Sequence, residues 1–472
     1  MPAKKTPAEP PKDLYQGIQP ERVQTLNDRE AGDGDYVLYW MQQAQRSEFN
    51  HALEFAIHRA NELKKPLLVA FGLMDDYPEA NLRHYHFMLE GLQDVEKALD
   101  KRGIPFILQR GAPDEVALEL AKKACLLVCD RGYLRIQRQW RERVAKEATC
   151  QVIQVESDVV VPVELASNKK EHAARTLRPR LTRHLERFLV PLPQAKLETV
   201  SDSLGVKGET LADIGKLLAK LRLEQQVPPV KLFRGGTGEA KKVLKAFLRD
   251  HFRTYSKNRN QPQTNDVSHM SKYLHFGQIS PLFVALEVKG TGANTNTDTY
   301  LEELIIRREL PMNYVFYEPD YDNYSALPDW AKKTLAEHKD DARDPGYTRK
   351  ELEDAETDDP YWNAAMRELK HTGYMHNYMR MYWGKKILEW SNTPEYAFET
   401  ALYLNNTYFI DGRDANSYAN VAWVFGQHDR GWAERAVYGK VRYMSAGGLE
   451  RKADPEAYVE KVKDLEQELE RS

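Results

Sequence analysis

The sequence predicts a two-part protein, in which an α/β domain with a doubly wound, Rossmann-like parallel sheet precedes a larger all-α domain. Three observations lead to this fold class. Between residues 34 and 165, continuous apolar runs alternate with amphipathic stretches, which is typical of buried parallel strands and the helices that connect them. The strand-like runs end near residue 166. From residue 238 to residue 472, nearly every segment has the helical period.

The elements of the first domain follow from this alternation. Strands are expected at 36–40, 66–73, 105–110, 126–130 and 151–156, and helices at 49–63, 83–102, 114–124 and 133–147. The first strand is not followed by Gly-x-Gly-x-x-Gly, so we do not expect a dinucleotide bound in the usual mode. The crevice at the carboxyl ends of the strands is still suited to a flat ligand.

The remaining segments complete the domain plan. Residues 1–33 are rich in Pro, Lys and Glu and are expected to form a disordered tail. Residues 166–237 contain "PLPQ", "VPPVK" and "RGGTG", which is typical of an interdomain linker with some helix. Helices of the second domain are expected at 238–253, 280–289, 298–316, 328–337, 361–371, 373–390, 394–405 and 454–471.

Composition limits the class of protein. The chain has 472 residues, of which 42% are apolar and 29% charged, with a net charge of −3, as in an ordinary globular protein. It lacks an apolar run long enough for a membrane span and an apolar signal segment at the start, so we expect a cytoplasmic protein. Cys125, Cys129 and Cys150 are few and lack a metal-binding spacing. We therefore expect buried, reduced thiols and no metal site.

Tryptophans are concentrated in the second domain. Trp383 and Trp390 are seven residues apart, which places them on one helix face about 10 Å apart along the axis. Trp362 begins the preceding helix, and an antiparallel helix pair would bring it toward Trp383. Three indoles in series are compatible with ordinary core packing or with an electron-hopping chain from the surface to a buried acceptor.

Three polar segments accompany these rings. The loop 404–423 carries Asn405, Asp411 and Arg413 among many other polar groups, which suit either a polar heterocycle or a helix cap. The segment 267–280 begins "VSHMS", a pattern that suits a phosphate at a helix start or, again, a simple cap. The segment 428–452 is locally basic and suits a polyanion or a solvated face.

Five sequence blocks in one order carry a family resemblance. "KYLHFGQIS", "EELIIRREL", "MRMYWGKKILEW", "IDGRDANSYANVAW" and "HDRGWAER…GKVRYMS" together resemble the class II cyclobutane pyrimidine dimer photolyases of the photolyase/cryptochrome family. The resemblance extends over about residues 30–455. It implies that reduced FAD, bent in the helical domain, repairs pyrimidine dimers in DNA under blue light. It also implies an antenna-type first domain, and we expect a monomer acting on damaged DNA.

The resemblance also assigns residues to the flavin. Arg380 and Asp411 would form a charged pair beside the flavin ring, and Asn405 would face its N5 atom. Trp383, Trp362 and Trp390 would conduct electrons, in that order outward. The phosphates, ribityl chain and remaining polar contacts are assigned to Tyr255, Val267, Ser268, His269, Met270, Ser271 and Arg413.

A second group is assigned to the lesion and the DNA. Glu303 would hydrogen-bond a thymine edge, and Arg307, four residues later, is expected on the same helical face. Met381 and Trp423 would form apolar walls for a dimer flipped out of the duplex. Contacts to the phosphates, or filling of the hole in the duplex, are assigned to Arg430, Trp432 and Arg442.

The sequence departs from the family pattern at two places, and two rival functions stay open. Lys272 stands where the family usually has Pro, and "DRGYLR" at 130–135, beside the antenna crevice, departs from the "DFSPLR" of many relatives. The antenna is a deazaflavin, a folate or absent. The rivals are a flavin photoreceptor that signals without repair and a redox flavoprotein whose tryptophans merely pack. The presence of Glu303, Met381 and Trp423 favours repair.

Overall fold

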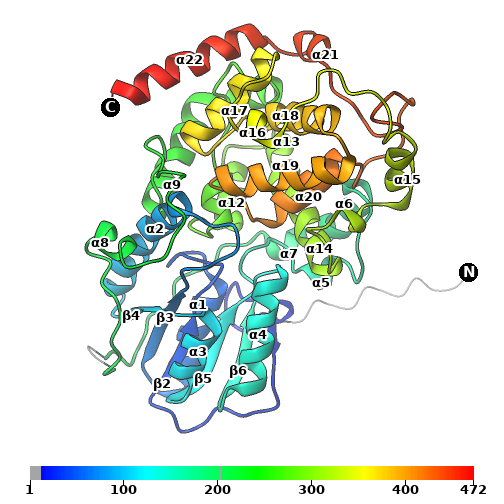
Figure 1. The fold of residues 1–472 in the computed structure, drawn as a ribbon. Coiled ribbons are helices and arrows are strands. Elements are labelled where there is room, and N and C mark those ends of the chain that lie inside the picture. The colour runs from blue at the N-terminus through cyan, green and yellow to red at the C-terminus, as the bar shows by residue number, and fades with distance from the viewer. Residues whose placement is uncertain (1–11, 202–203, 472) are drawn as a thin grey trace, which may run out of the picture.

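The computed structural model describes residues 12–201 and 204–471 and shows two stacked parts. In Figure 1, a sheet flanked by helices forms the lower part, and a larger group of helices lies above it. The expected fold class, an α/β domain followed by a helical domain, is confirmed.

The sheet has six strands in the order β1-β6-β5-β2-β3-β4. Their bounds are β1 Val23–Thr25, β2 Tyr36–Trp40, β3 Leu67–Leu73, β4 Phe106–Arg110, β5 Ala124–Asp130 and β6 Gln151–Val155. Neighbouring strands are parallel except for β1, which pairs antiparallel with β6. The strand order reverses between β2 and β5, so the strand ends leave a crevice at that point.

Helices cover both faces of the sheet, which explains why its inner strands β2, β3 and β5 are largely apolar rather than alternating. The helices are α1 His51–Leu63, α2 Leu82–Asp100, α3 Pro113–Ala121 and α4 Arg135–Glu147. Val37 and Tyr39 of β2 pack in the cluster that contains α1 and α2, whereas Leu38 and Trp40 pack in the one that contains α3 and α4. The side chains on both faces of β2 are therefore buried.

The expected disordered tail is wrong for the part that the structure describes. Residues 1–11 lie outside the described residues, but Pro20–Arg22 form a 3₁₀ turn that leads into β1 at the sheet edge. Arg22 is fully buried and donates to the carbonyls of Glu156, Val159 and Val160. A buried guanidinium with several acceptors fixes a segment that its composition alone does not.

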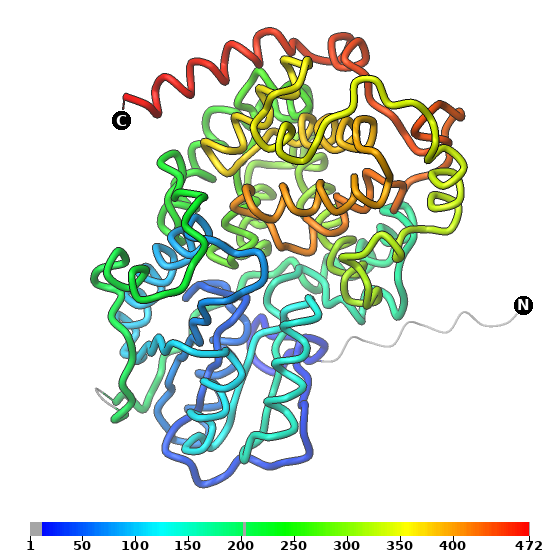
Figure 2. Tube along the Cα trace, in the orientation of Figure 1, coloured from blue at the N-terminus to red at the C-terminus, as the bar shows by residue number. Residues whose placement is uncertain are grey.

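The expected linker is packed against both domains. It follows α5 (Val163–Ala166) and contains α6 Ala174–Thr182, α7 Leu185–Phe188 and α8 Ile214–Leu218. Leu177 and Leu181 of α6 pack in the same cluster as Leu244 and Leu304 of the helical domain. Near its middle, Glu209 forms a bridge with Leu108 of the edge strand β4, and the Gln109 amide donates to the Lys207 carbonyl. Figure 2 shows this green segment following the side of the α/β domain before it enters the helical one. The segment therefore covers an exposed sheet edge.

The helical domain begins with α9 and ends with α22. Its longer helices are α9 Thr237–Ala246, α12 Pro281–Gly290, α13 Thr295–Leu301, α14 Arg308–Tyr317, α15 Asp329–Glu337, α17 Pro360–Thr372, α18 Asn377–Trp390, α19 Pro394–Tyr408, α20 Ala415–Val424 and α22 Pro455–Arg471. Short helices between them are α10 Tyr255–Asn258, α11 Ser271–His275, α16 Arg349–Glu353 and α21 Ala446–Glu450.

Three expected helices differ from the structure. The helix expected at 238–253 passes into a π-helix at Phe247–His251, and the one expected at 298–316 is interrupted by the π-helix η4 (Glu302–Arg307). The helix expected at 373–390 begins only at Asn377, because Gly373 takes the left-handed conformation that ends α17. A Cβ on Gly373 would also approach the Ile410 side chain to 2.5 Å, so glycine is required for both reasons.

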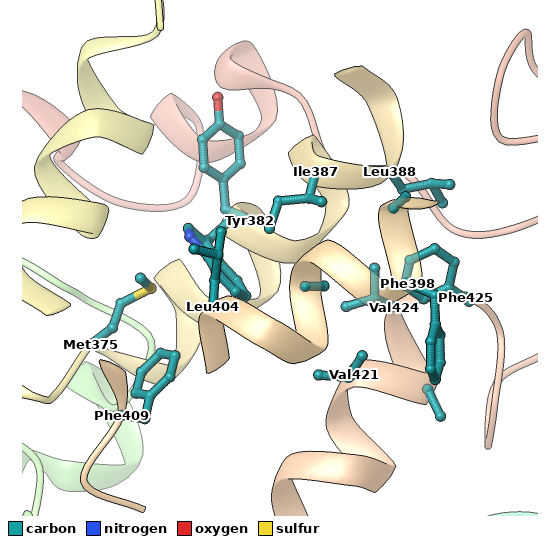
Figure 3. Packing of buried hydrophobic residues seen from close by; sticks show 14 of the residues in the cluster. Met375, Tyr382, Ile387, Leu388, Phe398, Leu404, Phe409, Val421, Val424 and Phe425 are labelled. Atoms are coloured by element: carbon teal, nitrogen blue, oxygen red, sulfur yellow. The ribbon is translucent and has the colours of Figure 1, made fainter. Parts of the chain in front are cut away.

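The core of the helical domain lies between α18, α19 and α20. Figure 3 shows Phe398 and Phe425 packed together near Val424 and Leu388. The rings of Phe398 and Phe425 are 5.3 Å apart. At the far side, the Tyr458 hydroxyl of α22 donates to the buried Glu368 of α17 at 2.6 Å. This core holds the tryptophan helices in place.

Other expectations concern cysteines, membranes and metals. Cys125, Cys129 and Cys150 are free and buried, as expected. Within residues 12–201 and 204–471, no helix combines the length and apolar character needed to cross a bilayer. The same residues contain no group of three or more His, Cys, Asp or Glu arranged to hold a metal ion.

Candidate functional site

The three tryptophans form one continuous stack of contacts. The ring centroids of Trp383 and Trp362 are 6.5 Å apart with nearly parallel planes, at 9°. Those of Trp362 and Trp390 are 5.6 Å apart at 69°. All three side chains are buried, with 3%, 0% and 5% exposed for Trp383, Trp362 and Trp390. The contact order Trp383, Trp362, Trp390 matches the predicted order.

The ends of α17 and α18 set this geometry. Asp359 caps α17 by accepting from the backbone N–H groups of Tyr361 and Trp362, each at 3.0 Å. The same carboxylate accepts a short hydrogen bond from the Tyr382 hydroxyl of α18. The Trp362 indole donates to the Trp383 carbonyl at 3.0 Å. These bonds fix the two helices as an antiparallel pair, so the indoles face one another.

Arg380 and Asp411 form the expected charged pair. Two guanidinium nitrogens of Arg380 donate to the two carboxylate oxygens of Asp411, each at 3.1 Å. Burial opposes ionisation of Asp411, but the charge of Arg380 and the Ser271 hydroxyl hold its pKa below the usual value. The guanidinium also lies 4.0 Å from the centroid of Phe409, whose ring contacts Trp383. The ion pair therefore adjoins the inner end of the tryptophan stack.

Lys272 is buried in an aromatic cage next to this pair. Its ammonium lies 3.6 Å from the centroid of Phe233 and 5.2 Å from that of Tyr374, and it donates to the His269 carbonyl at 3.0 Å. Burial lowers the pKa of Lys272 to about 7, although the nearby Asp411 carboxylate opposes the shift. A cation in this position is suited to an anionic ligand.

The 267–271 segment lies beside Lys272 and reaches the aromatic cluster around Tyr255. His269 has a left-handed backbone, with φ of 54°, and its ring lies 4.7 Å from that of Tyr374. The Ser268 hydroxyl accepts from the Tyr300 hydroxyl at 2.9 Å, and the Tyr300 ring is 5.3 Å from that of Tyr255. Met270 is buried, Val267 is partly exposed and Ser271 is exposed.

Buried polar atoms without partners provide a test of whether the site fits a flavin nucleotide. Among the described residues, His269 Nδ1, His376 Nε2 and Trp383 Nε1 are buried and lack a hydrogen-bond partner. Burial lowers the pKa of His376 to about 3, with help from the nearby charges of Lys461 and Arg380. Unpaired buried donors and acceptors are costly unless a ligand pairs with them. Together with the cationic Lys272, they fit a ligand with a polar ring and phosphates.

Asn405, expected at the flavin N5, lies near the same region. It is buried at the end of α19, and its amide nitrogen donates to the Asn406 side-chain oxygen at 2.9 Å. Asn406 in turn accepts from the Arg413 backbone N–H at 2.9 Å. The backbone of the 409–413 turn is therefore held by the two asparagines.

The expected contact between Glu303 and Arg307 is wrong. Both residues lie in η4, whose π-helical winding places residues five apart, rather than four apart, next to each other. Arg307 accordingly pairs with Glu302 at 3.2 Å. Glu303 pairs at 2.8 Å with Arg259, which follows α10. The carboxylate predicted to bind the lesion thus already faces a guanidinium.

The predicted DNA residues form one aromatic and cationic patch. The Arg442 guanidinium lies 4.9 Å from the Trp432 ring and 5.8 Å from the Trp423 ring, and that of Arg430 lies 5.4 Å from the Trp432 ring. Trp432 is 38% exposed, which is unusual for so large an apolar ring. Met381 is partly exposed on α18, two residues before Trp383.

A crevice separates the two domains at the carboxyl ends of β2 and β3. It encloses about 690 Å³ of empty space, partly open to solvent, and its lining includes Gln42, Tyr77, His84, Trp140, His275 and Arg413. Arg413 was assigned to the flavin, but its guanidinium donates to the Asn406 carbonyl and contacts His84 Nε2, so it lies on the crevice side. This assignment is corrected.

The 130–135 loop lies directly behind the crevice lining. Asp130 accepts from the backbone N–H of Gln42, and the Leu134 N–H donates to the Gln137 side chain, and both Gln42 and Gln137 line the crevice. The loop also joins the two domains, because Arg135 pairs with Asp322 of the helical domain.

Sequence reasoning missed several residues of the site. Arg259 stands four residues after Tyr255, but the segment has no strong helical pattern that would connect it to Glu303. Phe233 lies in the linker, and Tyr374 and Phe409 follow helix ends, so their aromatic cage forms only through tertiary packing. The unusual Lys272 was the one available signal, because a buried lysine needs such neighbours.

The fold and the site together define a class of two-domain flavoproteins, with an α/β domain, a helical cofactor domain and a buried tryptophan chain. The family model "DNA photolyase" matches residues 37–198, and "FAD binding domain of DNA photolyase" matches residues 300–466. The chain therefore belongs to the DNA photolyase family.

Relatives named deoxyribodipyrimidine photo-lyase match nearly the whole chain. The one from Methanothermobacter thermautotrophicus is 49% identical and covers 95% of this chain and 99% of its own length. The Arabidopsis thaliana relative is 38% identical over 95% and 94%. The relative from Potorous tridactylus is 36% identical over 90% and 81%.

Solved photolyase structures share the fold at lower identity. A class III photolyase from Agrobacterium tumefaciens has a TM-score of 0.72 at 18% identity, over 92% of this chain and 87% of its own. A Sulfolobus tokodaii photolyase with two FAD molecules has a TM-score of 0.69 at 18% identity, over 90% and 89%. At this identity the likeness concerns the fold alone.

Proposed function

We propose that this protein is a class II deoxyribodipyrimidine photo-lyase, which splits cyclobutane pyrimidine dimers in DNA under blue light. Relatives of that name, 36–49% identical over most of the chain, support the reaction. The observation that carries the proposal is the buried stack of Trp383, Trp362 and Trp390, whose inner end adjoins the Arg380–Asp411 pair. The enzyme acts as a monomer in the cytoplasm.

When bound and reduced, FAD supplies the photoexcited electron that opens the cyclobutane ring and takes it back afterwards. The chain binds and orients it. Lys272, His269 and the 267–271 backbone would hold the phosphates, and Tyr255 would close the same side. The Arg380–Asp411 pair and Asn405 would face the ring system and set its electrostatic environment. The three tryptophans would conduct electrons inward to restore the reduced form.

Glu303 and Arg259 receive the dimer. Their ion pair is partly exposed, with 33% of the Glu303 and 24% of the Arg259 side chain accessible, so a pyrimidine edge can reach both groups. Met381 and Trp423 line the apolar side of the pocket. Arg430, Trp432 and Arg442 contact the DNA around the extruded dimer, where phosphate binding adds a salt-dependent share of the affinity.

The crevice at the carboxyl ends of the inner strands would hold a second, light-harvesting chromophore. Its lining combines aromatic rings with Arg413, His84 and several glutamines, which suits a flat, polar ring system with anionic groups, such as a deazaflavin or a folate. The Rossmann-like strand order places this crevice at the switch point between β2 and β5.

The decisive experiment follows a dimer-containing oligonucleotide incubated with the flavin-loaded, reduced enzyme. We expect undamaged pyrimidines to appear under blue light and none in darkness. Tight binding of the oligonucleotide without repair in light would instead support a photoreceptor. Purified protein that binds no flavin in reconstitution would exclude both functions and leave the tryptophans as packing residues.

A further inference from the structure

Two tryptophans pack against different sides of one turn of α18. Trp383 stacks toward α17, whereas Lys385, two residues later, contacts the ring of Trp423 on α20. Gly384 lies between them and allows this close approach, because a Cβ there would come within 2.6 Å of the Val424 side chain. Under the proposed function, the flavin lies near both indoles, since one begins the electron-transfer chain and the other lines the dimer pocket.

Two cations lie over the ring of Trp423. The Lys385 ammonium is 4.8 Å from the ring centroid, and the Arg442 guanidinium is 5.8 Å from it. Lys385 is fully buried and donates a short hydrogen bond to the Val424 carbonyl, which holds the ammonium in place. The Asp429 carboxylate offsets part of this charge. Two cations and one carboxylate leave a net positive charge beside the ring.

The surroundings of Trp383 are different. Its ring contacts are with the uncharged rings of Trp362 and Phe409. Arg380, on the same helix, lies over the Phe409 ring at 4.0 Å, and both oxygens of Asp411 bind its guanidinium. The positive charge nearest to this part of the stack is therefore neutralised within an ion pair.

These surroundings make the two indoles unequal as electron donors. A cation over an aromatic ring attracts the neutral ring, but it repels the radical cation that remains after the ring has lost an electron. Because Lys385 is buried, water screens this repulsion only weakly. Removal of an electron from Trp423 is therefore harder than removal from Trp383, although the two side chains are chemically identical.

We propose that Lys385, together with Arg442, prevents photo-oxidation of Trp423 and so directs electron flow to the flavin through Trp383. This inference rests on the proposed function, which supplies the electron acceptor. In each photoreduction event, one indole loses one electron and becomes a radical cation, and the oxidised flavin gains that electron. Oxidation of Trp423 would place the positive charge in the dimer pocket instead of passing it along the stack. Lys385 acts through Trp423 and is a positioning residue.

The test opens the second route after the first has been blocked. Flavin-loaded, oxidised Trp383→Phe is compared with three forms that add Lys385→Met, Lys386→Met, or Lys385→Met with Trp423→Phe. Methionine is close to lysine in size but carries no charge. Lys386 is the matched control, because its ammonium also lies over an indole of the stack, at 5.3 Å from the Trp390 ring. Transient absorption after a light flash measures the tryptophan radical, and steady illumination measures flavin reduction.

At pH 6, we expect little tryptophan radical in Trp383→Phe. Adding Lys385→Met should increase its yield several-fold and restore part of the photoreduction, whereas adding Lys386→Met should not. Further addition of Trp423→Phe should abolish the gain. The absence of a gain with Lys385→Met, or a gain that persists after Trp423 is replaced, would overturn the inference.

The charge of Lys385 can also be changed without a substitution at this site. Burial lowers the pKa of Lys385 to about 7, and Asp429 opposes the shift while Arg442 adds to it. The other charged or titratable groups next to this part of α18 are Tyr438, Lys386 and Glu389. Burial raises the pKa of Tyr438, so its hydroxyl stays neutral, and Lys386 and Glu389 pair with each other at 2.8 Å. The Lys385 ammonium is therefore mostly charged at pH 6 and mostly neutral at pH 8.5.

The radical yield of Trp383→Phe should accordingly rise from pH 6 to pH 8.5. In the form that also carries Lys385→Met, the yield should be high at both pH values, and any pH effect of the flavin itself is common to both forms. An equal yield of Trp383→Phe at the two pH values would count against the inference, even if the Lys385→Met form failed to fold.

A repair assay separates this inference from the proposed function. Failure of the chemically pre-reduced wild type to split dimers in light would refute the proposed function, whereas the radical yields would still decide the role of Lys385. Equal flavin absorption and equal melting temperature in the four forms would show that the variants are folded.

Discussion

Replacing Lys272 by methionine tests whether an ammonium is buried at the cofactor site. Methionine is nearly the same size as lysine and retains contact with Phe233 and Tyr374, but it carries no charge. The ammonium of Lys272 has no carboxylate of its own in the site, because Asp411 is already bound by Arg380 through two hydrogen bonds. We therefore expect Lys272→Met to stabilise the protein without its cofactor and to weaken cofactor binding.

The size of the effect follows from the pKa. Burial lowers the pKa of Lys272 from 10.5 to about 7. At pH 6, Lys272 is protonated in both the native and the unfolded state. The native state then carries the full free-energy cost of the buried charge, which at 1.36 kcal/mol per pKa unit is about 5 kcal/mol as an upper bound. Between the two pKa values the unfolded chain holds the extra proton, so the wild type gains stability as pH rises. At pH 9.5 about 1.4 kcal/mol of the cost remains.

Urea unfolding of the two proteins without FAD, at pH 6 and pH 9.5, measures this difference. We expect the stability advantage of Lys272→Met to shrink by about 3 kcal/mol over that range, while the pH dependence common to both proteins cancels. With FAD bound, the advantage should fall or reverse at pH 6, because an anionic ligand then pairs with the ammonium. An advantage that is the same at both pH values would show that the ammonium is not buried as described.

Three further changes test the chain, the lesion site and the DNA surface. Trp383→Phe should block photoreduction of oxidised flavin yet spare repair by pre-reduced enzyme, and normal photoreduction in steady blue light would mean that another route exists. Glu303→Ala should lower the repair yield per absorbed photon with an unchanged flavin spectrum, and an unaltered yield would remove its assigned role. Arg442→Met should weaken binding of damaged and undamaged duplex alike and reduce the slope of log K against log salt by about 0.9, measured by fluorescence anisotropy. An unchanged slope would place Arg442 away from the phosphates.

The elements with strong periodic patterns were predictable from the sequence. The inner parallel strands β2, β3 and β5 are buried on both faces, so each gives a nearly continuous apolar run, which is typical of a buried parallel strand. The edge strand β1 was missed because it spans three residues and depends on the buried Arg22, whose three backbone acceptors lie more than 130 positions away. Local composition cannot reveal such long-range pairing.

In the candidate site, too, only the residues in regular helical patterns were predictable from the sequence. The shared face of Trp383 and Trp390 was predictable from their spacing of seven, and the helix pair predicted that Trp362 lies near Trp383. The order of the three rings came from the family resemblance and not from spacing. The ion-pair partner of Glu303 was not predictable, because the prediction assumed an α-helix where the chain forms a π-helix. The hydrogen bonds of a π-helix span five residues instead of four, so Arg307 pairs with Glu302, and Glu303 is left to pair with Arg259. Such a change of winding has no sequence marker as clear as proline.

The corrected position of Arg413 has a physical consequence for light harvesting. Asp411 pairs with Arg380, and Arg413, two residues later, lines the crevice between the domains. A turn of the backbone, with Arg413 in the left-handed conformation at φ of 61°, directs the two side chains to different sites. With the cofactor and the second chromophore bound as we propose, a single loop would separate them. Because Asn406 holds this loop through both the backbone and the side chain of Arg413, Asn406→Ala should disturb both sites together, with altered chromophore and flavin spectra in the same variant.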